Sequence, residues 1–225
     1  MGSDDLNTAS NARRIFTSLC SKADDSSDML ISPPVINEVK LIAASNDIIR
    51  YRIYEIMILL CCTSDSKLSS IDATGLLQPL LSDVNSDDIL IQLNALELLG
   101  TLVVHQHGRE YLLRNETIRN ISDQLSRSLS DPLASLTSPG LMKFLGIFVH
   151  SQPDRLSQLT AFTDTLMRII EDSEMSLQTV AIETVSFIAT ETRGKKALQK
   201  VLGNSIWNIF MSITDWKLKW IVPLS

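Results

Sequence analysis

The chain has 225 residues, a hydrophobic share of 44% and a formal net charge of -6 at neutral pH. That length suits one or two ordinary domains, or one stretch of stacked repeats. The acidic balance and the lack of a long basic cluster argue against non-specific nucleic-acid binding, which needs a surface of cations. Eight glycines and seven prolines are few for a protein of strands and tight turns. The composition therefore favours stacked helices.

In chain order, the apolar period predicts a helix over residues 8–22 and a second from Pro33 to about Ala44, because proline is tolerated in a first helical turn. A long helix follows over 47–62, capped by Asn46 or Asp47. Its apolar positions Ile49, Ile53, Ile56 and Leu60 form one stripe.

A short polar connection then leads to a helix over 72–83 and to a long helix over 88–104. Asp131-Pro132 and Ser138-Pro139-Gly140 are expected to interrupt the chain, with a helix only after them. The remaining helices are predicted over 109–114, 116–129, 140–150, 155–171, 174–191, 195–202 and 205–213.

The long helices repeat a pattern of residues. Glu55, Glu97 and Glu183 each lie in one of them, and a basic residue follows twelve positions later, at Lys67, Arg109 and Lys195. A further copy has Lys143 and Arg155 at these two positions. The copies are 42, 46 and 40 residues apart, and armadillo and HEAT repeats have a period of about 40–47 residues.

We therefore expect an all-α, armadillo/HEAT-like, right-handed superhelical solenoid over residues 1–225. Neither end of the sequence carries a polar capping repeat, so we also expect a fragment of a longer solenoid. The predicted repeats are 23–66, 67–108, 109–154 and 155–194, with partial repeats at 1–22 and 195–225.

The sequence offers little for catalysis. Cys20, Cys61 and Cys62 read as reduced thiols, and the histidines at 105, 107 and 150 as polar residues at helix ends, because no cluster has the spacing of metal ligands. Phosphate-binding loops and nucleophile motifs are missing from the sequence. The longest apolar run, Ile56 to Cys62, is too short to span a bilayer. We expect no enzyme activity, cofactor, metal or membrane partner.

Two sets of residues are candidates for binding a protein partner. Glu55, Glu97, Lys143 and Glu183 would form a row along one side of a solenoid, either reading a partner or only solvating a helix face. Asn46, Arg50 and Tyr54 are spaced by four residues, with Tyr51 beside them. Arginine and tyrosine are enriched in interface hot spots. Packing of the tyrosines between repeats, with the arginines paired to carboxylates, is the equal alternative.

The basic residues after the long helices also have two interpretations. A cation there interacts favourably with the helix C-terminus, by about 0.3–1 kcal/mol. The alternative is a basic edge for a partner's acidic residues. The residues are Lys67, Arg109, Arg155 and Lys195.

Three strings carry a resemblance to a known family. The segment Asn46-Asp47-Ile48-Ile49-Arg50-Tyr51-Arg52-Ile53-Tyr54-Glu55 resembles the "NDI-x-RYR-x-YE" segment of the 26S proteasome non-ATPase regulatory subunit 5 family. His107-Gly108-Arg109-Glu110-Tyr111-Leu112 is similar to its "HGR-x-YL" turn. Ser130-Asp131-Pro132, followed by Pro139 to Gly146, is the third similar string.

The resemblance implies a chaperone for assembly of the base of the proteasome regulatory particle, absent from the mature particle. Its implied partners are the C-terminal domains of proteasomal ATPases: subunit 1 first, subunit 2 alongside, and a non-ATPase base subunit as a further one. A monomer in the cytoplasm, and also in the nucleus, is expected. The alternative is a generic armadillo scaffold with another partner. An import-receptor groove is disfavoured because Asn94 is isolated and all three tryptophans lie at or beyond residue 207.

Overall fold

Helices make up all the regular secondary structure that the computed structural model describes, which is residues 10–11, 14–15, 18, 30–131 and 133–203. The chain forms two compact units, Met1–Asn115 (unit 1) and Glu116–Ser225 (unit 2). Most of the predicted helix 8–22, the predicted helix 205–213, Cys20 and the three tryptophans lie outside the described residues. None of the described helices combines the length and apolarity of a membrane span.

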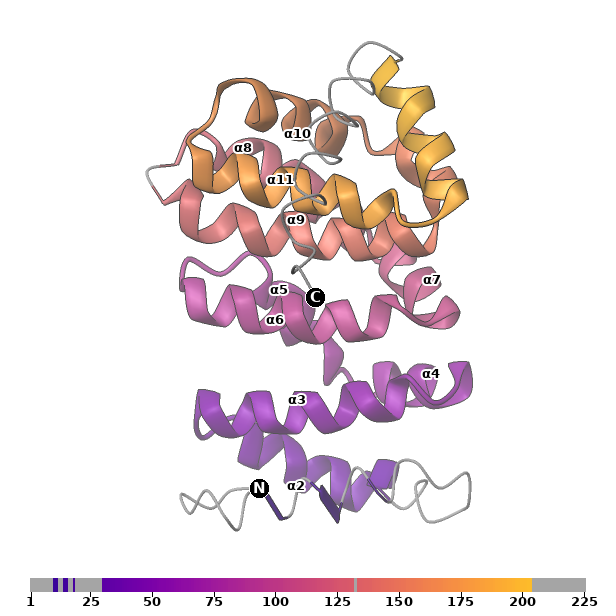
Figure 1. The fold of residues 1–225 in the computed structure, drawn as a ribbon. Coiled ribbons are helices and arrows are strands. Elements are labelled where there is room, and N and C mark those ends of the chain that lie inside the picture. The colour runs from indigo at the N-terminus through magenta and orange to yellow at the C-terminus, as the bar shows by residue number, and fades with distance from the viewer. Residues whose placement is uncertain (1–9, 12–13, 16–17, 19–29, 132, 204–225) are drawn as a thin grey trace, which may run out of the picture. The chain divides into compact units, whose positions relative to one another are not determined.

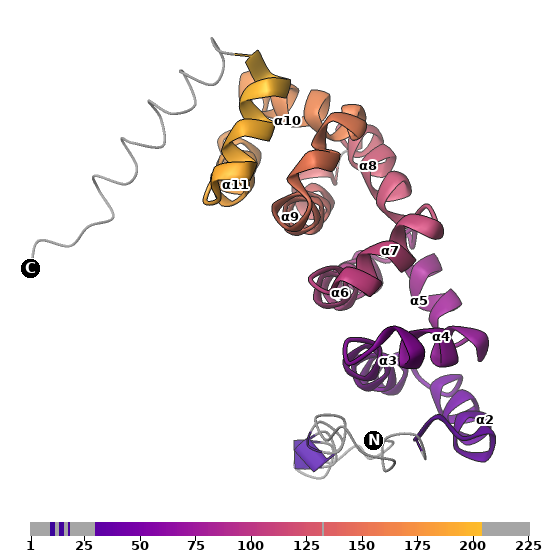
Figure 2. The ribbon, with the colours of Figure 1, turned by 90° about the vertical axis from the view of Figure 1, so that its right-hand side faces the viewer.

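Unit 1 stacks two long helices on one side and shorter helices behind them (Figures 1 and 2). The long helices α3 and α6 pack against each other, while α2 and α4 pack on α3, and α5 and α7 on α6. Leu60, Cys61, Ile71, Leu80 and Leu102 are fully buried between these layers. The described helices are α2 (Pro33–Ala43), α3 (Asp47–Cys61), α4 (Asp65–Ala73), α5 (Leu77–Asp83), α6 (Ile89–Val103) and α7 (Gln106–Arg114).

Side-chain caps fix where the helices of unit 1 begin. The Asn46 side chain accepts a hydrogen bond from the amide of Ile48 at the start of α3. The Ser64 hydroxyl accepts one from Lys67 in α4, and the Asp88 carboxylate accepts from Leu90 and Ile91 in α6. These short polar side chains satisfy amides that have no partner inside the helix.

Unit 2 has the same layering. The long helices α9 and α11 pack together on one side, and α8 and α10 lie behind them (Figure 2). Phe144, Phe148 and Phe162 are the largest fully buried side chains. The elements are α8 (Thr117–Ser128), α9 (Ala134–Ser151), the 3-10 helix η2 (Pro153–Gln158), α10 (Thr160–Asp172), α11 (Met175–Ile188) and a helix over 192–203.

Several predictions about the helices are wrong. The single helices predicted over 72–83 and 155–171 are each divided, the first at 74–76 between α4 and α5 and the second at Leu159 between η2 and α10. The segment expected to be a polar connection after α3 forms α4, which buries only Leu68 and Ile71 and so has almost no apolar pattern. Pro139 was expected to interrupt the chain but lies inside α9. The neighbouring Ser138 is fully buried and hydrogen-bonded to Ser128 of α8 at 2.8 Å, which holds the first turns of α9 in place.

Two glycines allow a short helix to contact the end of the preceding long helix. A Cβ atom at Gly108 in α7 would overlap the backbone carbonyl of Leu102 in α6. A Cβ atom at Gly194 would overlap the carbonyl of Ile188 in α11 in the same way. Each glycine comes directly before a basic residue of the repeated pattern, Arg109 or Lys195. The same close contact between a long helix and the next helix therefore occurs once within each unit.

Candidate binding grooves on the long helices

A groove of about 860 Å³ runs between the two long helices of unit 1. We call it the α3/α6 groove. The sequence-predicted residues Tyr51, Glu55 and Glu97 line it. Its full lining is Asp47, Ile48, Tyr51, Arg52, Glu55, Ile58, Leu59, Asp88, Leu90, Ile91, Asn94, Glu97, Leu98 and Thr101.

The lining follows the sequence repeat. Four positions on α3 face the groove together with the four positions 42 residues later on α6, because both helices present the same face to it. The interpretation of Glu55 and Glu97 as equivalent positions of neighbouring helices agrees with this arrangement. The pairs are Ile48 with Leu90, Arg52 with Asn94, Glu55 with Glu97 and Leu59 with Thr101.

The α3/α6 groove is acidic and partly apolar. Four carboxylates line it, those of Asp47, Glu55, Asp88 and Glu97, against a single guanidinium, that of Arg52. Ile48 and Leu90 are 64% and 72% exposed, which is high for aliphatic side chains of this size. Sequence reasoning missed this apolar pair, although the 42-residue period that relates the two glutamates also relates Ile48 to Leu90.

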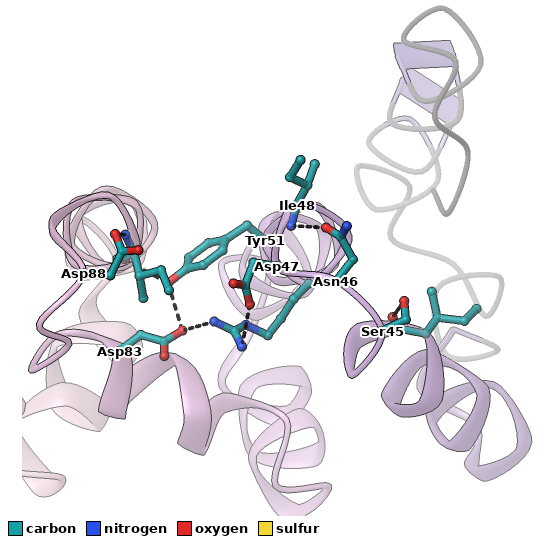
Figure 3. Close-up of polar contacts among 10 residues, drawn as sticks. Ser45, Asn46, Asp47, Ile48, Tyr51, Asp83 and Asp88 are labelled. Atoms are coloured by element: carbon teal, nitrogen blue, oxygen red, sulfur yellow. Dashed lines mark hydrogen bonds and ion pairs between the residues drawn. The ribbon is translucent and has the colours of Figure 1, made fainter.

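The other predicted contact residues on α3 serve the fold (Figure 3). Asn46 caps α3 through its contact with the Ile48 amide at 2.7 Å. Arg50 forms ion pairs with Asp47 at 3.0 Å and with Asp83 at the end of α5 at 3.3 Å. Burial alone would lower the pKa of Arg50, but the Asp83 and Asp47 carboxylates outweigh it and raise this pKa.

Tyr51 connects three helices. Its hydroxyl lies 2.8 Å from the Asp83 carboxylate (Figure 3). It also lies 2.9 Å from the backbone carbonyl of Ile91. A hydroxyl has one hydrogen, so it donates a hydrogen bond to only one of these two acceptors at a time. Burial, followed by the hydrogen bond to Asp83, raises the pKa of the phenol. Tyr51 is thus a packing residue that also lines the groove.

Tyr54 is not available to a partner. Its side chain is only 2% exposed, and its ring packs edge-on against Tyr51 with the centroids 5.6 Å apart. The prediction that Tyr54 belongs to an exposed contact with Asn46 and Arg50 is therefore wrong, and the alternative of tyrosine packing and paired arginine describes these side chains. The physical reason is that α3 is covered by α2, α4 and α6, so its buried arc is wider than the Ile49 to Leu60 stripe. A partner contact at Asn46 and Arg50 stays a prediction.

Unit 2 has its own groove of about 480 Å³ between α9 and α11, and it contains the two remaining predicted residues, Lys143 and Glu183. Both side chains are exposed. The surrounding lining is mostly apolar or small, so this groove carries one charge of each sign. The other lining residues are Pro139, Gly140, Gly146, Ile147, Val180, Thr184 and Phe187.

The basic residues that follow the long helices divide into two groups. The guanidinium of Arg109 donates to the backbone carbonyls of Val103, at 3.2 Å, and Val104 at the end of α6, which confirms the helix-end interpretation there. Arg155 instead donates to the Gln158 side chain at 2.9 Å, within η2. For Lys67 and Lys195 the helix-end role stays a prediction.

Histidines and cysteines pack between helices. His107 of α7 lies 2.8 Å from the carbonyl of Cys61, and His150 stacks on Phe187. Burial, then the nearby charges of His107 and Arg109, lowers the pKa of His105. Cys61 is buried and Cys62 half-buried, both as free thiols. Among the described residues, no three or more His, Cys, Asp or Glu side chains are arranged to hold a metal.

Solved structures with a similar fold are armadillo repeat proteins. One is a designed armadillo repeat protein in complex with the peptide (KR)4, with a TM-score of 0.53 and 12% identity, covering 88% of this chain and 83% of that chain. Another designed armadillo repeat protein has a TM-score of 0.52 and 13% identity, with coverage of 88% and 83%. This chain is therefore an all-α protein of the armadillo-like solenoid class.

The family follows from sequence comparison. The family model "Proteasome non-ATPase 26S subunit" matches residues 1–219. The 26S proteasome non-ATPase regulatory subunit 5 of Homo sapiens is 30% identical over 175 residues, covering 77% of this chain and 35% of that protein. The Bos taurus protein of the same name is 26% identical over 215 residues, covering 95% and 42%. The chain belongs to the 26S proteasome non-ATPase regulatory subunit 5 family, and it spans well under half the length of these relatives.

Proposed function

We propose that this chain is an assembly chaperone for the base of the 26S proteasome regulatory particle. In this proposal it holds the C-terminal domain of a proteasomal ATPase subunit and leaves before the particle is complete. The observation that carries the proposal is the family match over residues 1–219. The relatives' name places those proteins among the non-ATPase regulatory subunits of the 26S proteasome.

The surface of the long helices supports a role in binding. Each unit has an open groove there, one acidic with exposed Ile48 and Leu90, the other mostly apolar with Lys143 and Glu183. Contacts between exposed charges weaken with salt, because the Debye length is about 8 Å at physiological ionic strength. A partner held largely by such contacts can be released, as a transient chaperone requires.

ATPase subunit 1 is the partner we expect first, with subunit 2 alongside and a non-ATPase base subunit as a further contact. The chain would act by binding, with no chemistry of its own, as a monomer in the cytoplasm and the nucleus. A generic armadillo scaffold has the same fold but a different partner, so the identity of the captured protein separates the two.

The test is a pull-down of the six proteasomal ATPase C-terminal domains, each alone, by the purified chain at physiological salt. Selective capture of one domain, with subunit 1 expected, supports the proposal. Capture of none, while a longer relative captures one under the same conditions, overturns it for this chain. Sedimentation of cell extracts adds a check: the chain should migrate with base precursors, and migration with finished particles would contradict the proposal.

A further inference from the structure

A small groove of about 280 Å³ lies in unit 2 between η2 and the helix over 192–203, which is the yellow helix in Figure 1. We call it the η2 groove. We propose that it receives an acidic segment of a protein partner, with a glutamate or aspartate carboxylate placed against Lys196 and Lys200. The inference goes beyond the proposed function, because it concerns a surface apart from the grooves on the long helices and does not depend on which protein those grooves bind.

The first argument is charge. Residues 193–200 include four basic residues and no acidic one, although the whole chain has a net charge of -6. Three of these cations line the groove, and its one lining carboxylate, that of Asp154, is already ion-paired with Arg193. Lys196 and Lys200 are exposed, and neither has a hydrogen bond or an ion pair with a residue that the structure describes. Their ammonium groups are therefore the cations best placed to donate charge-assisted hydrogen bonds to a partner's carboxylate.

The second argument is the arrangement of the lining. Lys196 and Lys200 are four residues apart in one helix, so their side chains leave from the same face of it. Ala197 and Val201 repeat this spacing one position later and line the groove beside them, with Pro153 on the η2 side. The volume is slightly below the roughly 300–1,000 Å³ of ordinary small-molecule pockets. The groove therefore suits an acidic side chain of a docked segment, with its methylene groups against the small apolar residues.

The third argument is the contrast with unit 1. Tyr111 of α7 and Ala197 are equivalent positions, because 86 residues separate them, as they separate Gly108 from Gly194. The Tyr111 side chain is 2% exposed and its hydroxyl donates to Asp72 of α4 at 2.7 Å, so it occupies the space between these two helices. Alanine leaves the corresponding space in unit 2 open, and the η2 groove lies there.

The charge at the neighbouring position differs between the units as well. Glu110 of α7 is the counterpart of Lys196 by the same spacing, and its carboxylate accepts a hydrogen bond from Gln106. Unit 1 therefore has a carboxylate and a buried tyrosine where unit 2 has an ammonium group and a groove. A basic segment would be repelled by Lys196 and Lys200, and an uncharged one would leave them without a counter-charge. An acidic segment is thus the one that complements the η2 groove.

The test titrates two fluorescent peptides into the full chain at low salt. One peptide alternates glutamate with alanine, and the comparison peptide has glutamine in place of every glutamate. We expect the glutamate peptide to bind at least about fivefold more tightly, and its affinity to fall as salt is added, because contacts between exposed charges are screened. Equal affinities of the two peptides, or no binding of the glutamate peptide, overturn the inference.

Charge variants locate the bound peptide. Lys196→Gln/Lys200→Gln removes the two unpaired charges and should bind the glutamate peptide at least about fivefold more weakly than the wild type does. The matched control is Arg119→Gln/Arg168→Gln, which changes the net charge equally at exposed positions of α8 and α10 and should stay within about twofold of the wild type. An equal loss of affinity in both variants would mean that only net charge matters, and it overturns the groove assignment.

Ala197→Tyr tests the shape of the groove at constant charge. A tyrosine side chain, as in unit 1, should fill the space and weaken binding of the glutamate peptide at least about threefold. The control is Ala161→Tyr, at an equally half-buried position of α10 outside the groove lining. Circular dichroism and thermal melting check the folding of each variant, and Ala197→Leu replaces Ala197→Tyr should the latter melt early. Wild-type affinity of the folded groove variant would contradict insertion between η2 and the last described helix.

Inorganic phosphate separates a peptide site from a site for small anions. Binding of phosphate that requires Lys196 and Lys200, without binding of the glutamate peptide, would assign the groove to a small anion and overturn the inference. The outcome is distinguishable from that of the ATPase pull-down. Loss of peptide binding leaves the chaperone proposal standing, and capture of no ATPase domain leaves the acidic-segment proposal standing.

Discussion

Gly108 in α7 faces the backbone carbonyl of Leu102 in α6 so closely that even a methyl group would overlap it. Gly194 and Ile188 repeat this relationship in unit 2. The joint between a long helix and the next short helix thus depends on the absence of a side chain, and the backbone on the other side of the contact cannot move away without disturbing the long helix.

We expect Gly108→Ala and Gly194→Ala each to lower the free energy of unfolding by about 1–3 kcal/mol, the usual cost of forcing extra atoms into a packed site. Urea unfolding followed by circular dichroism measures the change. Ser69→Ala, at an exposed position of α4, is the control and should stay within about 0.5 kcal/mol of the wild type. If the glycine variants were as stable as this control, each long helix and the helix that follows it could move apart with little loss of stability, which would contradict the prediction.

Replacing Tyr54 by alanine should destabilise unit 1 by about 3–5 kcal/mol, because the side chain is almost fully buried and its loss leaves a cavity. Arg50→Glu would add a like-charge contact with Asp83 and Asp47. The double variant Arg50→Glu/Tyr54→Ala is therefore expected to have a lower helix content and a lower melting temperature, and to lose any binding as a result. Leu90→Ala, at a 72% exposed position, is the matched control and should leave the melt unchanged.

Stability should fall steeply in alkali. The chain has three tyrosines, and burial raises the pKa of Tyr54 to about 12. Burial and hydrogen bonds to Asp83 and Asp72 raise the pKa values of Tyr51 and Tyr111 as well. In the unfolded chain the phenols ionise near pH 10.

Because the folded pKa values are the higher ones, the contribution of the neutral phenols to stability is complete below about pH 10 and is lost as the pH rises through the folded pKa values. Tyrosinate absorbance and far-ultraviolet circular dichroism should therefore change together above pH 10. Ionisation of all three phenols near pH 10, with the helix content intact, would contradict this prediction.

The thiols of α3 and its end should react slowly. Burial raises the pKa of the Cys61 thiol, and it raises the pKa of Cys62 to about 11. In a Cys20→Ser variant at about pH 8, the fraction of Cys62 present as thiolate is roughly 100-fold lower than the fraction for an ordinary cysteine. A thiol reagent therefore reacts with Cys62 correspondingly more slowly. We expect rapid reaction of two thiols only after denaturant is added. Rapid reaction of the native protein would show that this region opens easily.

Arg109→Met should lower the free energy of unfolding by about 1–3 kcal/mol, because the Val103 and Val104 carbonyls at the end of α6 lose a charged donor. Arg119→Met is a suitable control, since that side chain is 78% exposed and makes only a long ion pair with Asp123, at 3.9 Å. Chemical denaturation of both variants compares the two sites. Equal effects would mean that the helix-end contact adds nothing to stability.

The sequence predicted the long helices and, within each unit, the pairing of equivalent positions on them, Glu55 with Glu97 and Lys143 with Glu183, because both depend on repeated spacing. The period that relates Glu55 to Glu97 is the one by which α3 and α6 present the same face to a shared groove. It did not predict α4, whose few apolar residues give no periodic signal and whose start depends on the Ser64 cap. The composition of the segment does not predict such a helix, because packing against α3 stabilises it.

The exposure of Tyr54 could not be judged from one helix either. A helix between neighbours on several sides buries more of its circumference than an amphipathic surface helix does. Seen alone, Tyr54 lies off the apolar stripe. Only the contacts of α3 with α2, α4 and α6 show that this side of the helix is covered as well. The cap of α3, by contrast, follows from the residue type: it was predicted at Asn46 or Asp47, and Asn46 is the residue that forms it.

The α3/α6 groove is made by two helices of successive repeats, so neither repeat possesses it when the other is unfolded. A ligand that binds there recognises only the state in which both are folded and packed. By mass action it would stabilise that state by about 2.7 kcal/mol at a concentration 100 times its dissociation constant. The protection of α3 and α6 amides against hydrogen exchange should then rise together on binding. Binding at the groove would thus show whether the two neighbouring repeats fold cooperatively.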